Sequence, residues 1–281
     1  MLIDLHAHSA VSDGTEPPEV LVAAAAAAGV DVLALTDHDT TAGWAAAARA
    51  ARAHGVRLVP GAELTARVGS IRVHLLSYLH DPTDLSLREA VDGARDTRVG
   101  RARRMTELLA ADHPLTWSDV QAQVRDGVSV GRPHLADALV RNGVVTSRDE
   151  AFATLLHEDS PYYVPHAAPR AEDLVRLVRA AGGVSVLAHP RAVGRGRVLD
   201  DGDIAALAAA GLGGLEVDHR EHPGEIREEL RALAASLGLL VTGGSDHHGA
   251  RKPNLLGENG TAPEVLAEIV ARGRGTAVIE G

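Results

Sequence analysis

The residues most able to do chemistry are two histidines near the start of the chain, in the segment Asp4-Leu5-His6-Ala7-His8. They end an apolar run, and Asp13 follows His8 after five positions. Successive side chains of an extended strand alternate between its two faces, so His6 and His8 point the same way and can bind one cation. The segment therefore predicts a metal site. Two buried histidines beside a helix start are the alternative.

Further candidate ligands stand at or near the ends of other apolar runs, where barrel enzymes assemble their active sites. They are His38, Glu63, His74, His189, Asp246 and His248. Asp246 and His248 repeat the opening arrangement, because they stand two positions apart after an apolar run. Asp37 and Asp39 flank His38 and have a simpler explanation, as caps of the next helix.

Together these segments offer more ligands than one metal ion needs, since a catalytic zinc takes three or four protein ligands. The candidates are His6, His8, Asp13, His38, Glu63, His74, His189, Asp246 and His248. We therefore expect two or three divalent metals. Mixed imidazole and carboxylate ligands favour Mn²⁺, Fe²⁺ or Zn²⁺ over Mg²⁺ and Ca²⁺, which prefer oxygen ligands alone. The chain has no cysteine, which excludes thiolate ligands and disulfides.

Composition limits the partners of this chain of 281 residues. A formal net charge of −10 argues against a long nucleic-acid groove, because phosphate binding needs a basic surface. One Phe, two Trp and three Tyr leave little material on which successive bases could stack. No uncharged apolar stretch approaches the roughly 20 residues of a membrane span, and the first apolar run directly follows Met1. We expect a cytoplasmic protein without a membrane partner.

Short apolar runs alternate with alanine-rich helical stretches, a pattern typical of βα units around a mostly parallel sheet. The runs are Leu2–Leu5, Val32–Thr36, Val56–Val59, Ile71–Ser77, Val184–Ala188, Leu215–Val217, Leu239–Thr242 and Ala277–Ile279. Pro17 and Pro18 open one helix, which ends at Gly29. Between residues 85 and 165 the strand pattern stops, and four helices are expected at Leu85–Ala111, Trp117–Arg125, Pro133–Asn142 and Ser147–His157. The sequence thus predicts an α/β domain with a helical insertion.

The combined motifs resemble those of the PHP (polymerase and histidinol phosphatase) family, and within it the TrpH/YciV-type phosphoesterases. The resemblance covers essentially the whole chain. It rests on His6-Ala7-His8, Thr36-Asp37-His38, Glu63, His74, His189, Gly131-Arg132-Pro133-His134, Tyr163-Val164-Pro165 and Asp246-His247-His248. It implies a distorted (β/α)₇ barrel formed by residues 1–84 and 166–281, with residues 85–165 as a helical insertion that caps the active site.

The resemblance also implies a trinuclear metal centre, with Mn²⁺ as the favoured ion. One metal would take His6, His8, Glu63 and Asp246. A second would take Glu63 as a bridging ligand together with His74 and His189, and the third would take Asp13, His38 and His248. The residues expected to act most directly in catalysis are Asp13, His38, Glu63, Asp246 and His222.

The activity implied is a phosphatase that removes the 3′-phosphate of nucleoside 3′,5′-bisphosphates such as pAp, through attack by a metal-bridged hydroxide. Arg132 and His134 would bind phosphate oxygens, with helix capping as their alternative role. Ser9 and His222 are further candidates for substrate contact, and His222 could also donate a proton. The segment His157–Ser160 carries two acids where relatives commonly have a basic residue. The resemblance therefore gives less support to a site for the second phosphate group of a bisphosphate substrate.

Three other functions remain open at this point. The first is a 5′→3′ exoribonuclease that acts on short RNA ends. The second is a phosphatase for histidinol phosphate or another sugar phosphate, although the Gly131–His134 motif favours a nucleotide. The third is a PHP scaffold that binds a ligand without turnover. We expect a monomer.

Overall fold

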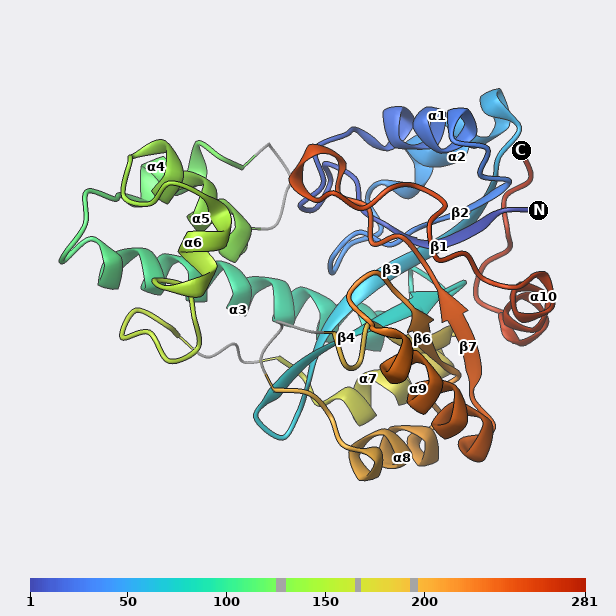
Figure 1. Ribbon diagram of the computed structural model, residues 1–281. Coiled ribbons are helices and arrows are strands. Elements are labelled where there is room, and N and C mark those ends of the chain that lie inside the picture. The colour runs from blue at the N-terminus through green and yellow to red at the C-terminus, as the bar shows by residue number, and fades with distance from the viewer. Residues whose placement is uncertain (125–129, 165–167, 193–196) are drawn as a thin grey trace. The chain divides into compact units, whose positions relative to one another are not determined.

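The computed structural model describes residues 1–124, 130–164, 168–192 and 197–281, and it divides into two compact units (Figure 1). The first, which we call the barrel unit, comprises Met1–Val91 and Pro169–Gly281, and the second, the helical unit, comprises Asp92–Ala168. The predicted boundary after residue 84 therefore lies before the one in the structure. The other predicted boundary, at residue 165, lies outside the described residues.

A seven-stranded sheet forms the barrel unit, and its strands are neighbours in chain order from β1 to β7. They are β1 (Ile3–Ala7), β2 (Val32–Leu35), β3 (Arg57–Val68), β4 (Ile71–Tyr78), β5 (Val184–Leu187), β6 (Gly214–Asp218) and β7 (Leu240–Gly243). β4 runs antiparallel to both of its neighbours, and the other neighbouring pairs are parallel. The prediction of a distorted α/β barrel is confirmed.

The barrel closes between its first and last strands through residues that follow β7. The Asp246 backbone N–H donates to the His6 carbonyl at 2.8 Å, and the His8 N–H donates to the His247 carbonyl at 2.9 Å. The buried Asp4 carboxylate accepts two more backbone N–H groups from the loops after β7. The seam of the barrel is thus held beside the candidate ligands.

Helices cover the sheet in two groups. They are α1 (Pro18–Ala27), α2 (Trp44–His54), α7 (Ala171–Ala180), α8 (Asp201–Ala210), α9 (Gly224–Leu237) and α10 (Pro263–Arg272), with a short 3₁₀ helix η1 (Gly249–Arg251). α1 and α2 pack on β1–β3, whereas α7, α8 and α9 pack on β3–β6. A third apolar cluster joins β1–β5 with α10. Each fully buried Leu or Val contributes about 1.5–3 kcal/mol to this packing.

The predicted helix limits agree with the structure where proline and glycine set them. Pro18 is the first residue of α1, a position where its missing N–H costs no hydrogen bond. Gly29 follows the helix end with a φ of 78°, a conformation that glycine adopts without strain. The run at Ala277–Ile279 was wrongly predicted as a strand, since Ile279 makes only an isolated bridge to Leu58.

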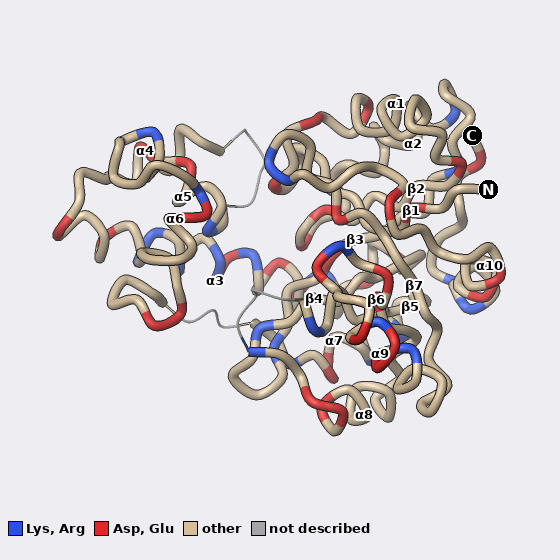
Figure 2. Tube along the Cα trace, in the orientation of Figure 1, with Lys and Arg blue, Asp and Glu red and all other residues tan. Residues whose placement is uncertain are grey.

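The helical unit contains all or part of four helices, which are α3 (Leu85–Leu109), α4 (Trp117–Gln121), α5 (Arg132–Arg141) and α6 (Arg148–Ala153). Residue 125, the predicted end of the second, lies outside the described residues. Figure 2 shows basic and acidic residues interspersed along α3. Arg104 pairs with Glu107 at 2.9 Å, and the Arg101 guanidinium lies 4.9 Å from the centre of the Tyr163 ring. Part of the basic character of α3 is therefore compensated locally.

None of the helices in the described ranges is long and apolar enough to cross a membrane. The cytoplasmic location stays a prediction.

His80 is a buried histidine beyond the candidate metal site. Its Nδ1 lies 2.8 Å from Ser77 Oγ, and its ring packs against Trp44 with the ring centres 5.1 Å apart. Burial lowers the pKa of His80 to about 4, because the charged imidazolium is poorly solvated in this position.

We expect His80 to destabilise the fold in acid. In the unfolded chain the imidazole takes up a proton near its ordinary pKa of 6.5, but the folded chain resists this until about pH 4. The free energy of unfolding therefore falls as the pH falls from 6.5 to 4, by about 3 kcal/mol in full. Urea unfolding at pH 7 and pH 5 should show a smaller pH effect in His80→Asn than in the wild type. The exposed His54→Asn is the control, and equal pH effects in all three proteins would contradict this assignment.

Candidate metal centre

Six of the seven strands supply the candidate ligands. Parallel strands present their carboxyl ends to one end of a barrel, so ligands at or just after those ends come together. His74 is the exception, because its strand is antiparallel, and it lies opposite Thr65 of β3 in the first half of β4. Eight of the candidate ligands thus lie together at one end of the barrel. They are His6, His8, His38, Glu63, His74, His189, Asp246 and His248.

The buried Glu63 carboxylate lies at the centre of these residues. Its Oε1 is 2.8 Å from His74 Nδ1 and 3.0 Å from His189 Nε2. Its Oε2 lies 3.1–3.3 Å from ring nitrogens of His6, His8 and His38. Burial by itself raises the pKa of a carboxyl group, but the neighbouring imidazoles outweigh burial and hold the pKa of Glu63 well below its ordinary value. One carboxylate is therefore placed to bridge several cations.

The first compact group consists of His6, His8, Glu63 and Asp246, whose ligand atoms all lie within 4.8 Å of one another. The Nε2 atoms of His6 and His8 are 3.1 Å apart, and Asp246 Oδ1 lies 3.5 Å and 3.4 Å from them. Lone pairs of two imidazoles and two carboxylates thus face one small volume, as ligands do around a cation. These four residues are those that we predicted for one metal.

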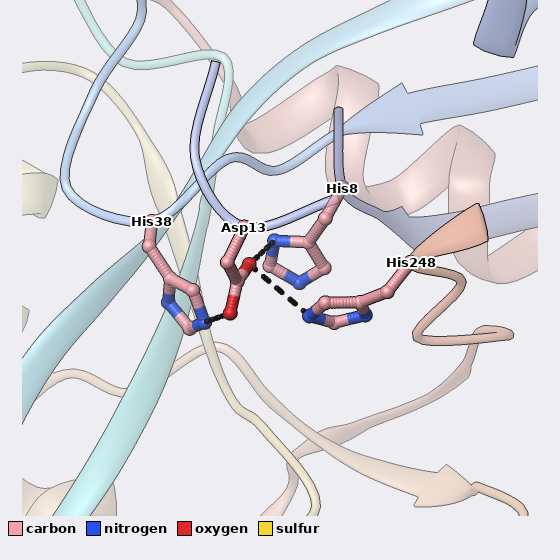
Figure 3. A group of neighbouring side chains, drawn as sticks. All are labelled: His8, Asp13, His38 and His248. Carbon is pink, nitrogen blue, oxygen red and sulfur yellow. Dashed lines mark ion pairs between the residues drawn. The ribbon is translucent and has the colours of Figure 1, made fainter. Parts of the chain in front are cut away.

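The second group surrounds Asp13 (Figure 3). Asp13 Oδ1 lies 3.2 Å from His248 Nε2 and 3.8 Å from His8 Nδ1, while its Oδ2 lies 3.8 Å from His38 Nε2. Burial and the nearby Lys252 lower the pKa of His248 to about 4. His248 is therefore neutral at pH 7, which is the form of imidazole that binds metals.

A third group consists of His38, Glu63 and His74. The three groups differ from the predicted division at two points. The group around Asp13 contains His8 in addition to the predicted His38 and His248. In the third group, His38 takes the place that we predicted for His189. His189 still contacts Glu63 Oε1 at 3.0 Å, so all nine candidates belong to one connected cluster.

Several buried atoms of this cluster fit a metal better than a hydrogen bond. His8 Nδ1, His38 Nδ1 and Asp13 Oδ1 are buried, and none has a hydrogen-bond partner among the described residues. Leaving a buried polar atom without a partner costs about 1–3 kcal/mol. Since all three are lone-pair donors of types that Mn²⁺, Fe²⁺ and Zn²⁺ accept, divalent cations would remove that cost.

The backbone is strained at two candidate ligands. His189 and Asp246 have φ values of 30° and 52°, in the left-handed region that residues with a Cβ rarely adopt. Asp39, the neighbour of His38, has a φ of 51°. Such conformations cost about 1–3 kcal/mol each and cluster at functional sites. Here they occur in the loops that follow β5, β7 and β2.

Glu216 and His219 support the cluster and were missed as functional residues. Glu216 is fully buried in β6, its Oε1 lies 2.8 Å from His6 Nδ1, and its Oε2 accepts the His189 backbone N–H at 2.8 Å. His219 Nε2 lies 3.4 Å from Asp246 Oδ2. Carboxylates that hold a ligating imidazole in this way fix its tautomer and orientation. A charged residue inside the apolar run 214–217 was the available signal for Glu216.

Ser9 and the aspartates beside His38 have structural roles. Asp37 Oδ2 accepts from Ser9 Oγ at 2.7 Å, and its Oδ1 accepts from Ser12 Oγ at 2.6 Å. Asp39 accepts from the Thr65 backbone and side chain at 2.7 Å and 2.8 Å. The suggestion that both aspartates cap the next helix was therefore wrong. Ser9 is fully buried, and this geometry favours positioning of the ligand loop over the predicted contact with substrate.

His222 is buried against backbone groups. Its Nδ1 donates to the Val217 carbonyl at 2.8 Å, and its Nε2 faces the Arg191 backbone N–H at 3.4 Å. Burial lowers the pKa of His222 below its ordinary value, and with Nδ1 donating to a carbonyl, Nε2 is the acceptor of the Arg191 N–H. This geometry does not favour the predicted role as proton donor, and substrate contact by His222 stays a prediction.

The predicted phosphate-binding residues Arg132 and His134 belong to the helical unit. His134 Nδ1 accepts the Gly131 backbone N–H at 3.1 Å, so the capping alternative applies to this residue. The Arg132 guanidinium lies over the rings of Phe152 and Tyr163, at 5.6 Å and 5.7 Å from their centres. Burial and the nearby charge of Arg101 lower its pKa to about 10, which still leaves it charged at pH 7. Phosphate binding by both residues stays a prediction.

Comparison with known proteins agrees with this geometry. The PHP domain family model matches residues 4–112. The 3′,5′-nucleoside bisphosphate phosphatase of Chromobacterium violaceum is 35% identical over 88% of this chain and 87% of its own length. The 5′-3′ exoribonuclease of Haemophilus influenzae is 31% identical over 87% of this chain and 89% of its own length.

A solved structure from Bifidobacterium adolescentis, classed as a metal-dependent phosphoesterase, has the same fold. It superposes with a TM-score of 0.93 at 45% identity, and the match covers 97% of this chain and 96% of that one. The similarity thus includes residues of both the barrel unit and the helical unit.

Proposed function

Because the chain belongs to the PHP domain family and is a metal-dependent phosphoesterase, we propose that it removes the 3′-phosphate of small nucleoside 3′,5′-bisphosphates. The observation that carries this proposal is the buried cluster in which Glu63 contacts five imidazoles. The relative from Chromobacterium violaceum, which bears this activity in its name, supports the choice of substrate.

We infer that the three ligand groups hold two or three divalent cations, with Mn²⁺ favoured and Fe²⁺ or Zn²⁺ as alternatives. Such cations supply an activated water and neutralise charge on phosphoryl oxygens. Glu63 and Asp246 place their negative charges among the imidazoles, and Asp13 does the same between His38 and His248. Glu216 holds His6 in one orientation, so its Nε2 stays directed at the cluster.

A panel of phosphate esters tests this function. Phosphate release should be measured with added Mn²⁺ from pAp, 5′-AMP, 3′-AMP and histidinol phosphate, beside a chelated control. We expect pAp to be the preferred substrate and the chelator to abolish release. Activity on histidinol phosphate alone would assign the chain to that other branch of the family.

A 5′→3′ exoribonuclease is the second candidate function, and the Haemophilus influenzae relative favours it. The net charge of −10 opposes it for long strands, because an RNA groove needs a basic surface. Short 5′-phosphorylated RNA oligomers added to the same panel distinguish the two. Release of mononucleotides at a rate above that of phosphate from pAp would favour the exoribonuclease.

We predict that Arg132→Ala lowers kcat/KM for pAp by roughly 10²-fold or less, because one charge-assisted phosphate contact contributes about 1.5–3 kcal/mol. Burial and, after it, the nearby charge of Arg101 lower the pKa of Arg132, and a bound anion would offset both effects. Steady-state kinetics on pAp and on 3′-AMP measures the effect. An unchanged kcat/KM on both substrates would remove Arg132 from the substrate site.

A further inference from the structure

Lys252 is unusual in this chain because of its residue type. Of the 28 basic residues in the sequence, it alone is a lysine, and all the others are arginines. Arginine presents a broad planar fork, whereas lysine presents a compact, strongly hydrated point charge. A chain that otherwise uses arginine for every positive charge has its one ammonium group at position 252.

That ammonium group lies at the edge of the candidate metal centre. Lys252 Nζ is 2.7 Å from Asp246 Oδ2, while Oδ1 of the same carboxylate faces His6 and His8 at 3.5 Å and 3.4 Å. The lysine side chain is 30% exposed. An ammonium group has three N–H donors, and Asp246 is its one acceptor among the described residues. Two donors therefore remain for a bound molecule.

The backbone before Lys252 is fixed against the loop that carries Asp13. Gly249 has a φ of 64°, and a Cβ at this position would lie 2.0 Å from Thr15 Oγ1. The Ala250 N–H donates to the same hydroxyl at 3.0 Å, and Arg251 Nη1 donates to the Asp13 carbonyl at 2.6 Å. The backbone from which Lys252 extends is therefore held against the loop of Asp13 by these hydrogen bonds.

A positive charge in this position opposes the binding of cations, because like charges repel more strongly in a poorly solvated site. If Asp246 needed only a hydrogen-bond donor, a neutral group would suffice, and His219 Nε2 already lies 3.4 Å from its Oδ2. The ammonium charge becomes favourable once an anion binds beside the metals. Phosphoryl oxygens are such anions, and lysine binds them as a point charge.

We propose that Lys252 contacts the substrate directly, by donating to a phosphoryl oxygen of the ester bound at the metal centre. This inference rests on the proposed phosphatase function. Lys252→Gln should lower kcat/KM for the preferred ester by about 10- to 100-fold, since it removes one charge-assisted contact. Lys252→Arg should retain part of the activity. Metal content should equal that of the wild type in both variants, and Arg272→Gln, which removes a distant exposed charge, is the control.

A chemical experiment on the wild-type protein tests the contact without turnover. Acetic anhydride has two amines to modify, the Lys252 side chain and the α-amine of the chain. With Mn²⁺-loaded protein, inorganic phosphate should slow acetylation of Lys252 and leave acetylation of the α-amine unchanged, as followed by mass spectrometry. The α-amine thus serves as an internal reference.

Two results would overturn the proposal. One is acetylation of Lys252 at the same rate with and without phosphate. The other is a Lys252→Gln variant that loses metal in proportion to activity, because Lys252 would then act only by positioning Asp246. If the wild type hydrolyses none of the esters, the proposed function fails, but the acetylation rates still report whether Lys252 contacts phosphate.

Discussion

Replacing Glu63 with Gln is expected to lower phosphoesterase turnover on the order of 10³-fold or more while the barrel stays folded. Loss of a single stabilising donor at an active site already costs about 10²–10³-fold, and Glu63 contacts five candidate ligands at once. The amide keeps the shape of the side chain but removes its charge. It also directs an N–H₂ group at imidazole nitrogens that must offer lone pairs to a metal.

Steady-state kinetics, metal analysis and circular dichroism of Glu63→Gln together check this result. We expect reduced metal content with an unchanged far-ultraviolet spectrum. Glu258→Gln is a matched control, because Glu258 pairs with Arg220 at 2.5 Å and contacts none of the candidate ligands among the described residues. A Glu63→Gln enzyme with full metal content and activity within tenfold of the wild type would contradict the bridging role.

Removal of the metals is expected to abolish activity and to lower the melting temperature. A cation that binds only the folded chain at 100 times its Kd stabilises the fold by about 2.7 kcal/mol. For a chain of this size that corresponds to about 5–10 °C per site. Calorimetry before and after chelation measures the shift, and addition of Mn²⁺ should restore both melting temperature and turnover.

Metal uptake should also depend on pH. Burial disfavours the charged form of His8, but contacts with Asp246 and Glu63 outweigh burial and raise its pKa to about 9 in the metal-free chain. At pH 7 a cation must therefore displace the proton of His8, and the apparent metal affinity falls as the pH falls. Chelation that leaves turnover intact at any pH would contradict a metal-dependent reaction.

The sequence was a good guide to the candidate ligands and a poor guide to what holds them. His6, His8 and Asp246 could be found because scarce residue types follow apolar runs, and this is a local signal. The contact of Glu216 with His6 joins residues 210 positions apart, so no spacing in the chain indicates it. The contact of Ser9 with Asp37, which lies in the loop after β2, was missed for the same reason, and substrate contact by Ser9 stays a prediction.

The length of β3 was predicted less well than its position. β3 continues to Val68, well beyond the apolar run that ends at Val59, because its residues 61–68 pair with β4. Residues 62–68 do alternate, with Ala62, Leu64, Ala66 and Val68 in the apolar core and Glu63, Thr65 and Arg67 between them. This signal was missed because the small alanines and the polar residues leave no continuous apolar run. Residues 277–279 show the reverse case, in which an apolar run finds only one bridging partner.

The metal centre lies beside the seam between β1 and β7, so metal binding would also affect the closure of the barrel. His6 and His8 come from the start of the chain, whereas Asp246 comes from near its end, and a cation bound to these three residues would be a cross-link. In extracellular proteins a disulfide performs this task, and closure of a long loop restricts the unfolded chain most. This chain has no cysteine. Its catalytic ions would thus join the two ends of the sheet in addition to the seam hydrogen bonds, which ties loss of activity to opening of the barrel.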